Sequence, residues 1–429
     1  MKGWAQLTLG LGLLAAGAAG TIWSLNVNDE VDVKTPMAYA PSDSLIAHGA
    51  YLARAGNCVA CHTVRGGPSY AGGLAIATPF GTVFTSNLTP DANTGIGSWS
   101  SAYFWRALHN GRSKSGRLLY PAFPYPSYTQ VTRDDSDAIF AYLRSLPAVE
   151  QTNRPNTLRF PFNLQSALAV WRALYFKPGV YQPDASHSAE WNRGAYLVKG
   201  LGHCSDCHSP RDALGGTRPS LALAGGLIPV QNWYAPSLQS PKEAGVGDWS
   251  LEHIVSLLKN GVAPGASVSG PMAEVVLRST QYLNQQDLGA MAQYLKALSV
   301  SNPQPEAPAP ARPASASSTT EKAAKLYEEH CAQCHGDKGQ GVVNAYPPLA
   351  GNRAVTMPSA ENLVQIVLNG GFPPATQGNP RPFGMPPFLL LLNDGEVATL
   401  ITHIRTSWGN QASDITPMEV NRVRAHQPR

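Results

Sequence analysis

Cys58-Val59-Ala60-Cys61-His62 is the stretch that decides how this chain folds. The pattern returns as Cys204-Ser205-Asp206-Cys207-His208 and again as Cys331-Ala332-Gln333-Cys334-His335, and the three copies use all six cysteines. Cys-x-x-Cys-His is the attachment signature of c-type haem, in which two thiols form thioethers with the haem vinyl groups and the imidazole binds the iron. Two residues between the thiols let one turn of backbone present both sulfur atoms to one porphyrin edge.

A Cys-x-x-Cys pair also occurs in thioredoxin-like redox sites and in zinc sites. Here each pair is followed directly by His, three times over, and no cysteine lies elsewhere in the chain. Disulfides are disfavoured too, because a two-residue loop between cysteines is a poor structural staple. We therefore expect three covalently bound haem c groups. The expected attachment thiols are those of Cys58, Cys61, Cys204, Cys207, Cys331 and Cys334, and the expected proximal iron ligands are His62, His208 and His335.

Length and composition frame this expectation. With 429 residues, the chain is long enough for about two to four domains, each with its own core. The formal net charge of +4 is small for this length, which argues against a nucleic-acid partner. The 40 glycines and 36 prolines favour short helices joined by long irregular loops. The sequence thus predicts an all-α fold of three tandem cytochrome c-like domains, each with one covalently attached haem c.

The N-terminus has the features of an export signal. Lys2 precedes an apolar run from Trp4 to Trp23, in which residues 15–20 are all Ala or Gly. A positive start, an apolar centre and small residues at a cleavage point are typical of a secretory signal peptide, so we assign residues 1–25 to one. The alternative is an uncleaved anchor, which the length of the run barely permits. In both cases we expect the body of the chain at the periplasmic face of the bacterial inner membrane.

The rest of the chain divides at repeats and at changes of composition. Gly194-Ala195-Tyr196-Leu197 repeats Gly49-Ala50-Tyr51-Leu52 shortly before the next motif, which indicates an internal duplication. Residues 303–320, rich in Pro, Ala and Ser, cannot bury a core and are predicted to be a linker. The expected domains are 44–150, 151–302 and 321–410, followed by a C-terminal tail at 411–429.

Capping residues and the helical spacing of apolar residues predict the helices that frame each motif. One helix leads into the first motif from Leu45, and two more helices follow every motif. The first of these two ends at Asn-Gly in all three units. The predicted starts of the helices after the motifs are the capping stretch 98–101 and Thr132, Ser250 and Asn284, and Ser359 and Asn393.

The sixth iron ligand decides the redox role of each haem. A thioether is soft and prefers ferrous iron, so His/Met ligation raises the potential relative to bis-His ligation and leaves no site for a substrate or for oxygen. Met272 and Met385 follow their haem motifs at comparable distances, in stretches rich in Gly and Pro. A methionine is more often core filler, but in such a place we interpret both as iron ligands.

The first unit breaks this pattern. Its corresponding position holds Phe123, which cannot bind iron, and no methionine follows the motif within this unit. The open alternatives are a five-coordinate iron, a histidine such as His109 or His48, or a methionine from elsewhere such as Met37. A histidine near the end of a helix, as His109 is, is also explained by the helix dipole. The sequence leaves this ligand undecided.

Several longer stretches extend beyond the haem motifs: Gly49 to Thr63, Thr78-Pro79-Phe80-Gly81, Asn87 to Asp91, Arg193 to Leu197, Gly202-His203-Cys204 and Gly270 to Val276. They resemble the triple-haem cytochrome c subunit of bacterial membrane-bound dehydrogenases, known from quinoprotein alcohol dehydrogenase and flavin-dependent gluconate dehydrogenase. The resemblance implies that a separate catalytic subunit, a quinoprotein or a flavoprotein, oxidises an alcohol, aldehyde or sugar. It also implies that the electrons pass through these haems to ubiquinone in the cytoplasmic membrane, with Met272 and Met385 as ligands.

Phe123 departs from the family pattern, because many members have a methionine there in a Tyr-Pro-Ala-Met-Pro-Tyr loop. Related cytochrome subunits that accompany molybdenum hydroxylases resemble the Phe variant, so a molybdenum hydroxylase is an alternative partner. Two other classes of function stay open. A five-coordinate first iron would suit a haem peroxidase, although no separate catalytic constellation is visible. A chain that only docks and anchors a partner would not need its haem ligands for electron flow.

Contact with the cytoplasmic membrane surface is plausible from the apolar stretches. Apart from the N-terminal run, no segment is long enough to span a bilayer. The stretches from Val170 to Phe176 and from Phe388 to Leu392 could lie on lipid or on a partner. Buried core is the better interpretation of both.

Overall fold

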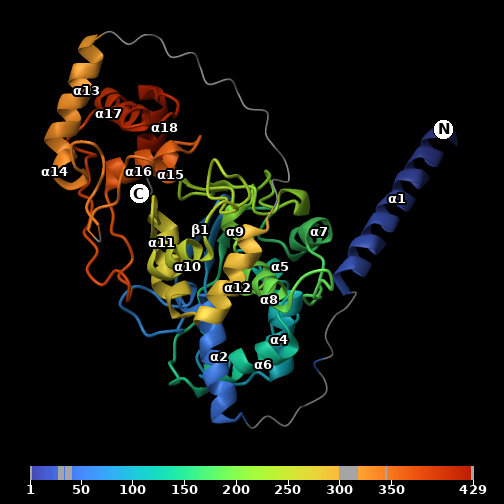
Figure 1. Cartoon of the computed structure of the whole chain (residues 1–429). Coiled ribbons are helices and arrows are strands. Elements are labelled where there is room, and N and C mark those ends of the chain that lie inside the picture. Colours follow the sequence, from blue (N-terminus) through green and yellow to red (C-terminus); the bar gives the residue numbers. More distant parts are fainter. Residues whose placement is uncertain (1, 28–32, 34–40, 299–316, 344, 427–429) are drawn as a thin grey trace.

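Helices make up 45% of this chain in a computed structural model, and the strands are few and short (Figure 1). The structure describes residues 2–27, 33, 41–298, 317–343 and 345–426. Beyond an N-terminal helix, the described residues form three segments with more helix than strand, each with one haem motif. We call them the first (41–175), second (189–298) and third (317–426) segments.

The elements follow one another in a repeated order. The N-terminal helix is α1 (Lys2–Val27). The first segment holds α2 (Asp43–Ala55), α3 (Cys58–Cys61), β1 (Ala75–Thr78), β2 (Gly81–Phe84), α4 (Ser101–Asn110), α5 (Tyr125–Tyr128), α6 (Arg133–Ser145), β3 (Thr157–Leu158) and α7 (Gln165–Tyr175). The second holds α8 (Ala189–Lys199), α9 (Ser205–His208), η1 (Pro219–Leu221), β4 (Gly226–Ile228), β5 (Trp233–Ala235), α10 (Leu251–Asn260), β6 (Val262–Ala263), β7 (Ala266–Ser267), α11 (Gly270–Arg278), η2 (Thr280–Tyr282) and α12 (Gln285–Lys296). The third holds α13 (Ser317–His330), α14 (Ala332–His335), α15 (Arg353–Thr356), α16 (Glu361–Asn369), α17 (Asp394–Thr406) and α18 (Pro417–Ala425).

Short antiparallel strands lie in the loops that follow the first two motifs. β1, β2 and β3 form one sheet in that order, with Ile76 opposite Val83 and Gly81 opposite Leu158. β4 pairs with β5, and β6 pairs with β7. The all-α prediction is therefore wrong for these loops. Their backbone N–H and C=O groups need hydrogen-bond partners, and a hairpin supplies them.

In each segment the helix before the motif packs against the second of the two helices that were predicted after the motif. The pairs are α2 with α6, α8 with α12, and α13 with α17. Glycines permit the first two close approaches. A Cβ atom on Gly49 would overlap the backbone carbonyl of Ala138, and one on Gly194 would overlap that of Ala290. The repeated Gly-Ala-Tyr-Leu stretch therefore marks a helix crossing.

The helix ends follow the predicted signals closely. Four predicted caps accept a hydrogen bond from the backbone N–H three residues further on: Thr132, Ser250, Asn284 and Asn393. Ser100, which lies within the predicted capping stretch 98–101, caps α4. In the third segment, α16 begins at Glu361 rather than at Ser359. α4, α10 and α16 all end at an Asn, because the glycine that follows adopts a positive φ that other side chains disfavour.

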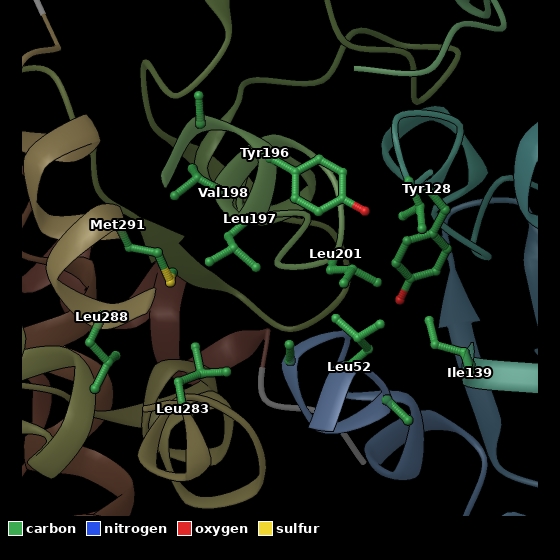
Figure 2. Packing of buried hydrophobic residues seen from close by; sticks show 14 of the residues in the cluster. Leu52, Tyr128, Ile139, Tyr196, Leu197, Val198, Leu201, Leu283, Leu288 and Met291 are labelled. Atoms are coloured by element: carbon green, nitrogen blue, oxygen red, sulfur yellow. The ribbon is translucent and has the colours of Figure 1, made fainter. Parts of the chain in front are cut away.

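The first and second segments share one cluster of buried hydrophobic residues. Figure 2 shows Leu201, which follows α8, between Leu52 of α2 and Tyr128 of α5. Leu52 is 0% exposed and Leu201 is 2% exposed. The two segments therefore fold around a common interior, which the sequence repeat alone does not reveal.

Two tyrosine–aspartate hydrogen bonds cross between these segments reciprocally. Tyr51 of α2 donates to Asp287 of α12 over 2.7 Å, and Tyr196 of α8 donates to Asp135 of α6 over 2.6 Å. Tyr51 and Tyr196 are equivalent residues of the two Gly-Ala-Tyr-Leu repeats. Asp287 also accepts two hydrogen bonds of 2.8 Å from Arg193 of its own segment. The sequence duplication thus produces a pseudo-symmetric contact.

The third segment has a hydrophobic core of its own. Phe388 and Leu392 are buried in it as predicted, whereas Leu390 and Leu391 are 95% and 68% exposed, so the core prediction is wrong for these two. α18 packs on α16 and α17, with Val420 fully buried. The predicted tail at 411–429 therefore contains a helix that completes this core. Of the predicted linker, 303–316 lies outside the described residues, and 317–320 belongs to α13.

Polar groups join the third segment to the second. Asn362 of α16 pairs with the backbone of Tyr234 in β5: its Oδ1 accepts from the N–H over 2.9 Å, and its Nδ2 donates to the carbonyl oxygen over 2.7 Å. Arg353 forms an ion pair with Asp248 at 3.0 Å. The second and third segments belong to separate cores, and the polar contacts between them resemble those of an interface between domains.

α1 projects away from the body of the molecule in Figure 1, and its C-terminal end contacts α7. There Asn26 is buried: its Nδ2 donates to the carbonyl oxygen of Ala169, and its Oδ1 accepts from Arg172, both over 2.9 Å. Within the part of the chain that the structure describes, none of the helices has the length and apolar character needed to cross a bilayer. The assignment of residues 1–25 to a signal peptide stays a prediction.

Candidate haem-binding sites

Each haem motif forms a single helical turn just after the first helix of its segment, in α3, α9 and α14. In each turn the backbone N–H of the histidine donates to the backbone carbonyl oxygen of the first cysteine, over 3.0, 2.9 and 2.9 Å. A residue with positive φ precedes two of the motifs: Asn57 with 51° and His203 with 37°. Such a residue ends the preceding helix and lets a new turn begin, so that both cysteines and the histidine lie on one turn.

The three motif histidines are held alike, each with Nδ1 close to a backbone carbonyl oxygen. The pairs are His62 with Ser86 at 2.7 Å, His208 with Pro236 at 2.7 Å, and His335 with Pro347 at 2.9 Å. Because a carbonyl only accepts, Nδ1 carries the proton, and the Nε2 lone pair of the neutral ring is left for a metal. Burial lowers the pKa of all three imidazoles, which favours this neutral form.

All six cysteines lie in the described part of the chain, and none forms a disulfide. Burial raises the pKa of the Cys58, Cys204 and Cys331 thiols to about 12 each. Burial therefore disfavours, at these three cysteines, the thiolate that a thioredoxin-like redox pair needs. Among the described residues, no group of three or more His, Cys, Asp or Glu side chains is arranged to hold a metal ion.

A cavity of about 1330 Å³ opens at the first motif. Its wall includes Cys58, Cys61 and His62, and most of its remaining surface is apolar. Sites for drug-sized ligands usually measure about 300–1,000 Å³, so this cavity has room for a large planar group. Two thiols and a neutral imidazole at an apolar wall fit a covalently attached haem.

α7 contributes to the same wall, which the sequence interpretation missed. Val170, Trp171 and Leu174 line the cavity. Val170 is 42% and Leu174 is 62% exposed, so the prediction of buried core is wrong for these two residues. Their i, i+4 spacing puts them on one face of α7, and this face points to the cavity rather than to the protein core.

The predicted methionine ligands lie in different local structures. Met272 is in the first turn of α11, directly after Pro271, rather than in a loop. Met385 lies in an extended stretch that is paired with Gly371 through two backbone hydrogen bonds of 2.8 and 3.0 Å. Both methionines are half-buried against core residues of their segments. Their roles as iron ligands stay predictions.

Phe123 lines the cavity at the first motif. Of the alternative ligands left open by the sequence, His109 is buried and His48 is largely exposed, and neither lines this cavity. Met37 lies outside the described residues. The structure therefore brings the phenylalanine, and neither of these histidines, to the first site.

The first and second motifs lie close together, and Tyr128 contacts the approach to both. Its hydroxyl donates to the carbonyl oxygen of Gly56, just before the first motif, over 3.0 Å. Its ring packs edge-on against His203, just before the second motif, with 5.6 Å between ring centroids. Burial and, more weakly, neighbouring charges that include Cys61 raise the pKa of Cys207 to about 11. Cys207 also lines the cavity at the first motif.

Comparisons with known proteins agree with this chemistry. The cytochrome c family model matches residues 46–147 and 320–408. The cytochrome c subunit of alcohol dehydrogenase (quinone) from Gluconacetobacter polyoxogenes is 38% identical over 409 residues, which cover 91% of this chain and 86% of that protein. The gluconate 2-dehydrogenase cytochrome c subunit of Pantoea cypripedii is 37% identical over 407 residues, covering 90% of this chain and 92% of that one.

A third relative has a different kind of name. A nicotinate dehydrogenase subunit of Pseudomonas putida is 39% identical over 391 residues, which cover 89% of this chain but 32% of that longer protein. The cytochrome c family implies covalently bound haem c with iron. On its motif geometry and these relatives, the chain belongs to the family of dehydrogenase cytochrome c subunits that includes those of alcohol dehydrogenase (quinone) and gluconate 2-dehydrogenase.

Proposed function

We propose that this chain is the three-haem electron-transfer subunit of a dehydrogenase complex and passes electrons from a catalytic subunit to ubiquinone. One observation carries the proposal: all three Cys-x-x-Cys-His turns hold the histidine by the same Nδ1 hydrogen bond to a backbone carbonyl. A single such turn would be weak support. Three turns with the same histidine geometry support three haem attachment sites. The names of the relatives supply the dehydrogenase partner.

Each motif residue has a defined part in this function. The two thiols of each motif would hold the group covalently, and His62, His208 and His335 would each bind an iron through Nε2. A bound haem c supplies an iron that takes up and releases one electron. The carbonyl bonded to Nδ1 fixes the ring orientation and makes the imidazole a stronger ligand. Met272 and Met385 would add a thioether and so favour the ferrous state.

The arrangement of the sites supports a relay. Electronic coupling falls steeply with distance, so neighbouring sites exchange electrons fastest. Tyr128 and His203 bring the first and second motifs together, and Asn362 fixes the third segment to the second. In the proposed relay, electrons pass directly between the first and second haems, and the third haem connects through the second segment.

The place of this relay is the periplasmic face of the inner membrane. The apolar N-terminal run supports export, with residues 1–25 as signal peptide and the uncleaved anchor as the alternative. Mass spectrometry of the chain purified from membranes distinguishes the two. A mature chain that begins after the run of small residues supports cleavage, and a chain that retains Met1 or Lys2 supports the anchor.

The haem content tests the central claim. We expect the denatured full-length chain, made in a host that attaches haem c, to be heavier than its polypeptide by three haems. The pyridine haemochrome assay should also give three haems per chain. A Cys331→Ala/Cys334→Ala double variant should lose one haem and keep two. A denatured chain that weighs no more than its amino acids would refute the proposal.

Electron flow tests the relay itself. Membranes that contain the complex should reduce a short-chain ubiquinone analogue when the dehydrogenase substrate is added. The Cys331→Ala/Cys334→Ala variant should slow this reduction strongly. An unchanged rate would favour a chain that only docks and anchors its partner.

A second candidate partner is a dehydrogenase of an aromatic acid such as nicotinate, because the Pseudomonas putida relative carries that name. The molybdenum hydroxylase that the sequence suggested through Phe123 stays an alternative. Co-purification from membranes identifies the partner, and its cofactor separates the candidates. Quinone cofactor or flavin in the large subunit supports an alcohol or sugar dehydrogenase, whereas molybdenum supports a hydroxylase.

A further inference from the structure

The side chain of Tyr128, at the end of α5, contacts the chain just before the first motif and just before the second. Its hydroxyl donates to the carbonyl oxygen of Gly56 over 3.0 Å, two residues before the first cysteine of the first motif. Its ring packs edge-on against the ring of His203, which directly precedes Cys204, with 5.6 Å between centroids. Tyr128 therefore connects the entrances of two haem attachment turns.

Gly56 and His203 lie where these two turns begin. Residues 56–58 and 202–204 are equivalent in the sequence repeat, and Asn57 and His203 both have a positive φ, 51° and 37°. The backbone at these points sets the direction in which each turn leaves its preceding helix. A side chain that holds both Gly56 and His203 therefore fixes the two turns relative to each other.

Tyr128 is itself held firmly, since it is 6% exposed. Figure 2 shows Leu201 between Tyr128 and Leu52, and a Cβ atom on Gly56 would lie 3.5 Å from Cδ2 of Leu201. The ring of Phe123 lies 5.4 Å from that of Tyr128, measured between centroids. Burial raises the pKa of the Tyr128 phenol well above its ordinary value, so the hydroxyl keeps the proton that it donates to Gly56.

The second motif also reaches the first site at this point. Asp206 and Cys207 line the same cavity as Cys61 of the first motif. The hydroxyl of Ser127, the residue before Tyr128, lies 3.5 Å from a carboxylate oxygen of Asp206. A thiol of each turn thus borders one cavity, so groups attached to the two turns would be neighbours.

The corresponding residues of the other two segments serve their own segments. Counted back four residues from the helix cap that follows, the position of Tyr128 is taken by Thr280 in the second segment and by Leu389 in the third. Thr280 donates its hydroxyl hydrogen to the carbonyl oxygen of Leu258 in the same segment. Leu389 packs against the core of the third segment. The contact of Tyr128 with two motifs is therefore not a requirement of the repeated fold.

We propose that Tyr128 is a positioning residue that holds the first two attachment turns at a fixed separation and thereby sets the rate at which the first and second haems exchange electrons. The inference rests on the proposed function, in which all three motifs carry haem. The step moves one electron from a ferrous to a ferric haem: one iron is oxidised, the other is reduced, and no bond or proton is exchanged. Its rate depends on the gap between the haems, because electronic coupling falls steeply with distance.

Electron redistribution within the full-length holoprotein tests this role. A flash-excited ruthenium complex injects one electron, and the haem absorbance follows its movement between sites. The phase that persists in the Cys331→Ala/Cys334→Ala variant belongs to the first two haems. Tyr128→Phe, which loses only the hydrogen bond to Gly56, should slow this phase several-fold. Tyr128→Leu, which also loses the ring contact with His203, should slow it further.

Thr280→Val is the matched control, because it removes a buried hydroxyl at the corresponding position of the second segment. It should leave the rate unchanged. Neither Tyr128 variant changes a proposed iron ligand, so the haem content should stay at three per chain and the midpoint potentials should not move. If Tyr128→Leu loses haem, the comparison of Tyr128→Phe with Thr280→Val decides the question.

The outcomes separate this inference from the proposed function. A native rate in both Tyr128 variants, each with three haems, would overturn the inference and leave the proposed electron-transfer function standing. Equal slowing in Thr280→Val would overturn it too, because the loss of any buried contact would then act alike. So would a shift in midpoint potential that accounts for the slower rate, since the driving force rather than the separation would have changed. A native chain with fewer than three haems would overturn the proposed function itself.

Discussion

Removing the hydroxyl of Tyr51 tests whether the first two segments are joined as the structure describes. Tyr51→Phe deletes the donor of the 2.7 Å hydrogen bond to Asp287 and keeps the ring. A hydrogen bond to a charged group contributes about 1.5–3 kcal/mol. Asp287 keeps two hydrogen bonds from Arg193, so its carboxylate is not left unpaired. We therefore expect the free energy of unfolding to fall by about 1.5 kcal/mol, the low end of this range.

The equivalent change on the other side should behave alike. Tyr196→Phe removes the 2.6 Å hydrogen bond to Asp135, again at a cost of about 1.5 kcal/mol. The two hydrogen bonds have neighbouring partners, because the guanidinium of Arg193, which binds Asp287, lies 5.5 Å from the centre of the Tyr196 ring. The double variant should therefore depart from additivity by about 0.5 kcal/mol or more.

Urea unfolding of the full-length holoprotein, followed by circular dichroism, measures these changes. With an m-value of about 3 kcal/mol per molar urea, a loss of about 1.5 kcal/mol lowers the midpoint by about 0.5 M. Tyr282→Phe is the matched control, since Tyr282 is 47% exposed and should change stability by less than about 0.5 kcal/mol. Equal midpoints for Tyr51→Phe, Tyr196→Phe and Tyr282→Phe would refute the reciprocal contact.

The same contact predicts a pH dependence. Burial raises the pKa of Asp287, but the hydrogen bonds from Arg193 and Tyr51 outweigh it, and the net pKa lies below the ordinary value. A carboxyl group with a lowered pKa in the folded state stabilises the fold fully above its unfolded pKa of about 3.9, and this stabilisation is lost as the pH falls through the folded pKa. The effect of Tyr51→Phe should therefore be full at pH 7 and shrink below about pH 4. An effect that grows in acid would contradict this assignment.

Three further predictions follow from individual contacts. Gly49→Ala should lower the free energy of unfolding by about 1–3 kcal/mol, because its Cβ would overlap the backbone of α6. Gly289 has open space around it, so Gly289→Ala should stabilise α12 by about 0.5–1 kcal/mol. Equal thermal midpoints for the two variants would contradict the close crossing of α2 and α6. Met385→His should leave the haem attached and lower its midpoint potential, and an unchanged redox titration would show that Met385 does not bind iron. Asn362→Ala removes both hydrogen bonds to Tyr234 and should make the connection before the third segment more sensitive to limited proteolysis; an unchanged cleavage rate would show that this contact does not hold the segments together.

The sequence alone was sufficient for features built from neighbouring residues. The Cys-x-x-Cys-His turn, the caps at Thr132 and Asn393, and the glycine that ends α4 all depend on atoms within a few residues of one another. For the same reason, the backbone hydrogen bond from His62 to Cys58 could be expected from the motif. Its partner for Nδ1, the carbonyl of Ser86, could not.

Features that join distant parts of the chain appeared only in the tertiary structure. The common interior of the first two segments, the face of α7 in the cavity wall, and the packing of α18 on the third core bring together residues far apart in sequence. Apolar spacing shows that a helix has a face to cover, but not what covers it, because burial depends on the shapes of all the neighbouring elements. The sequence therefore predicted the covalent chemistry of the three motifs. Only the packing decided that Phe123, rather than His109 or His48, stands at the first site.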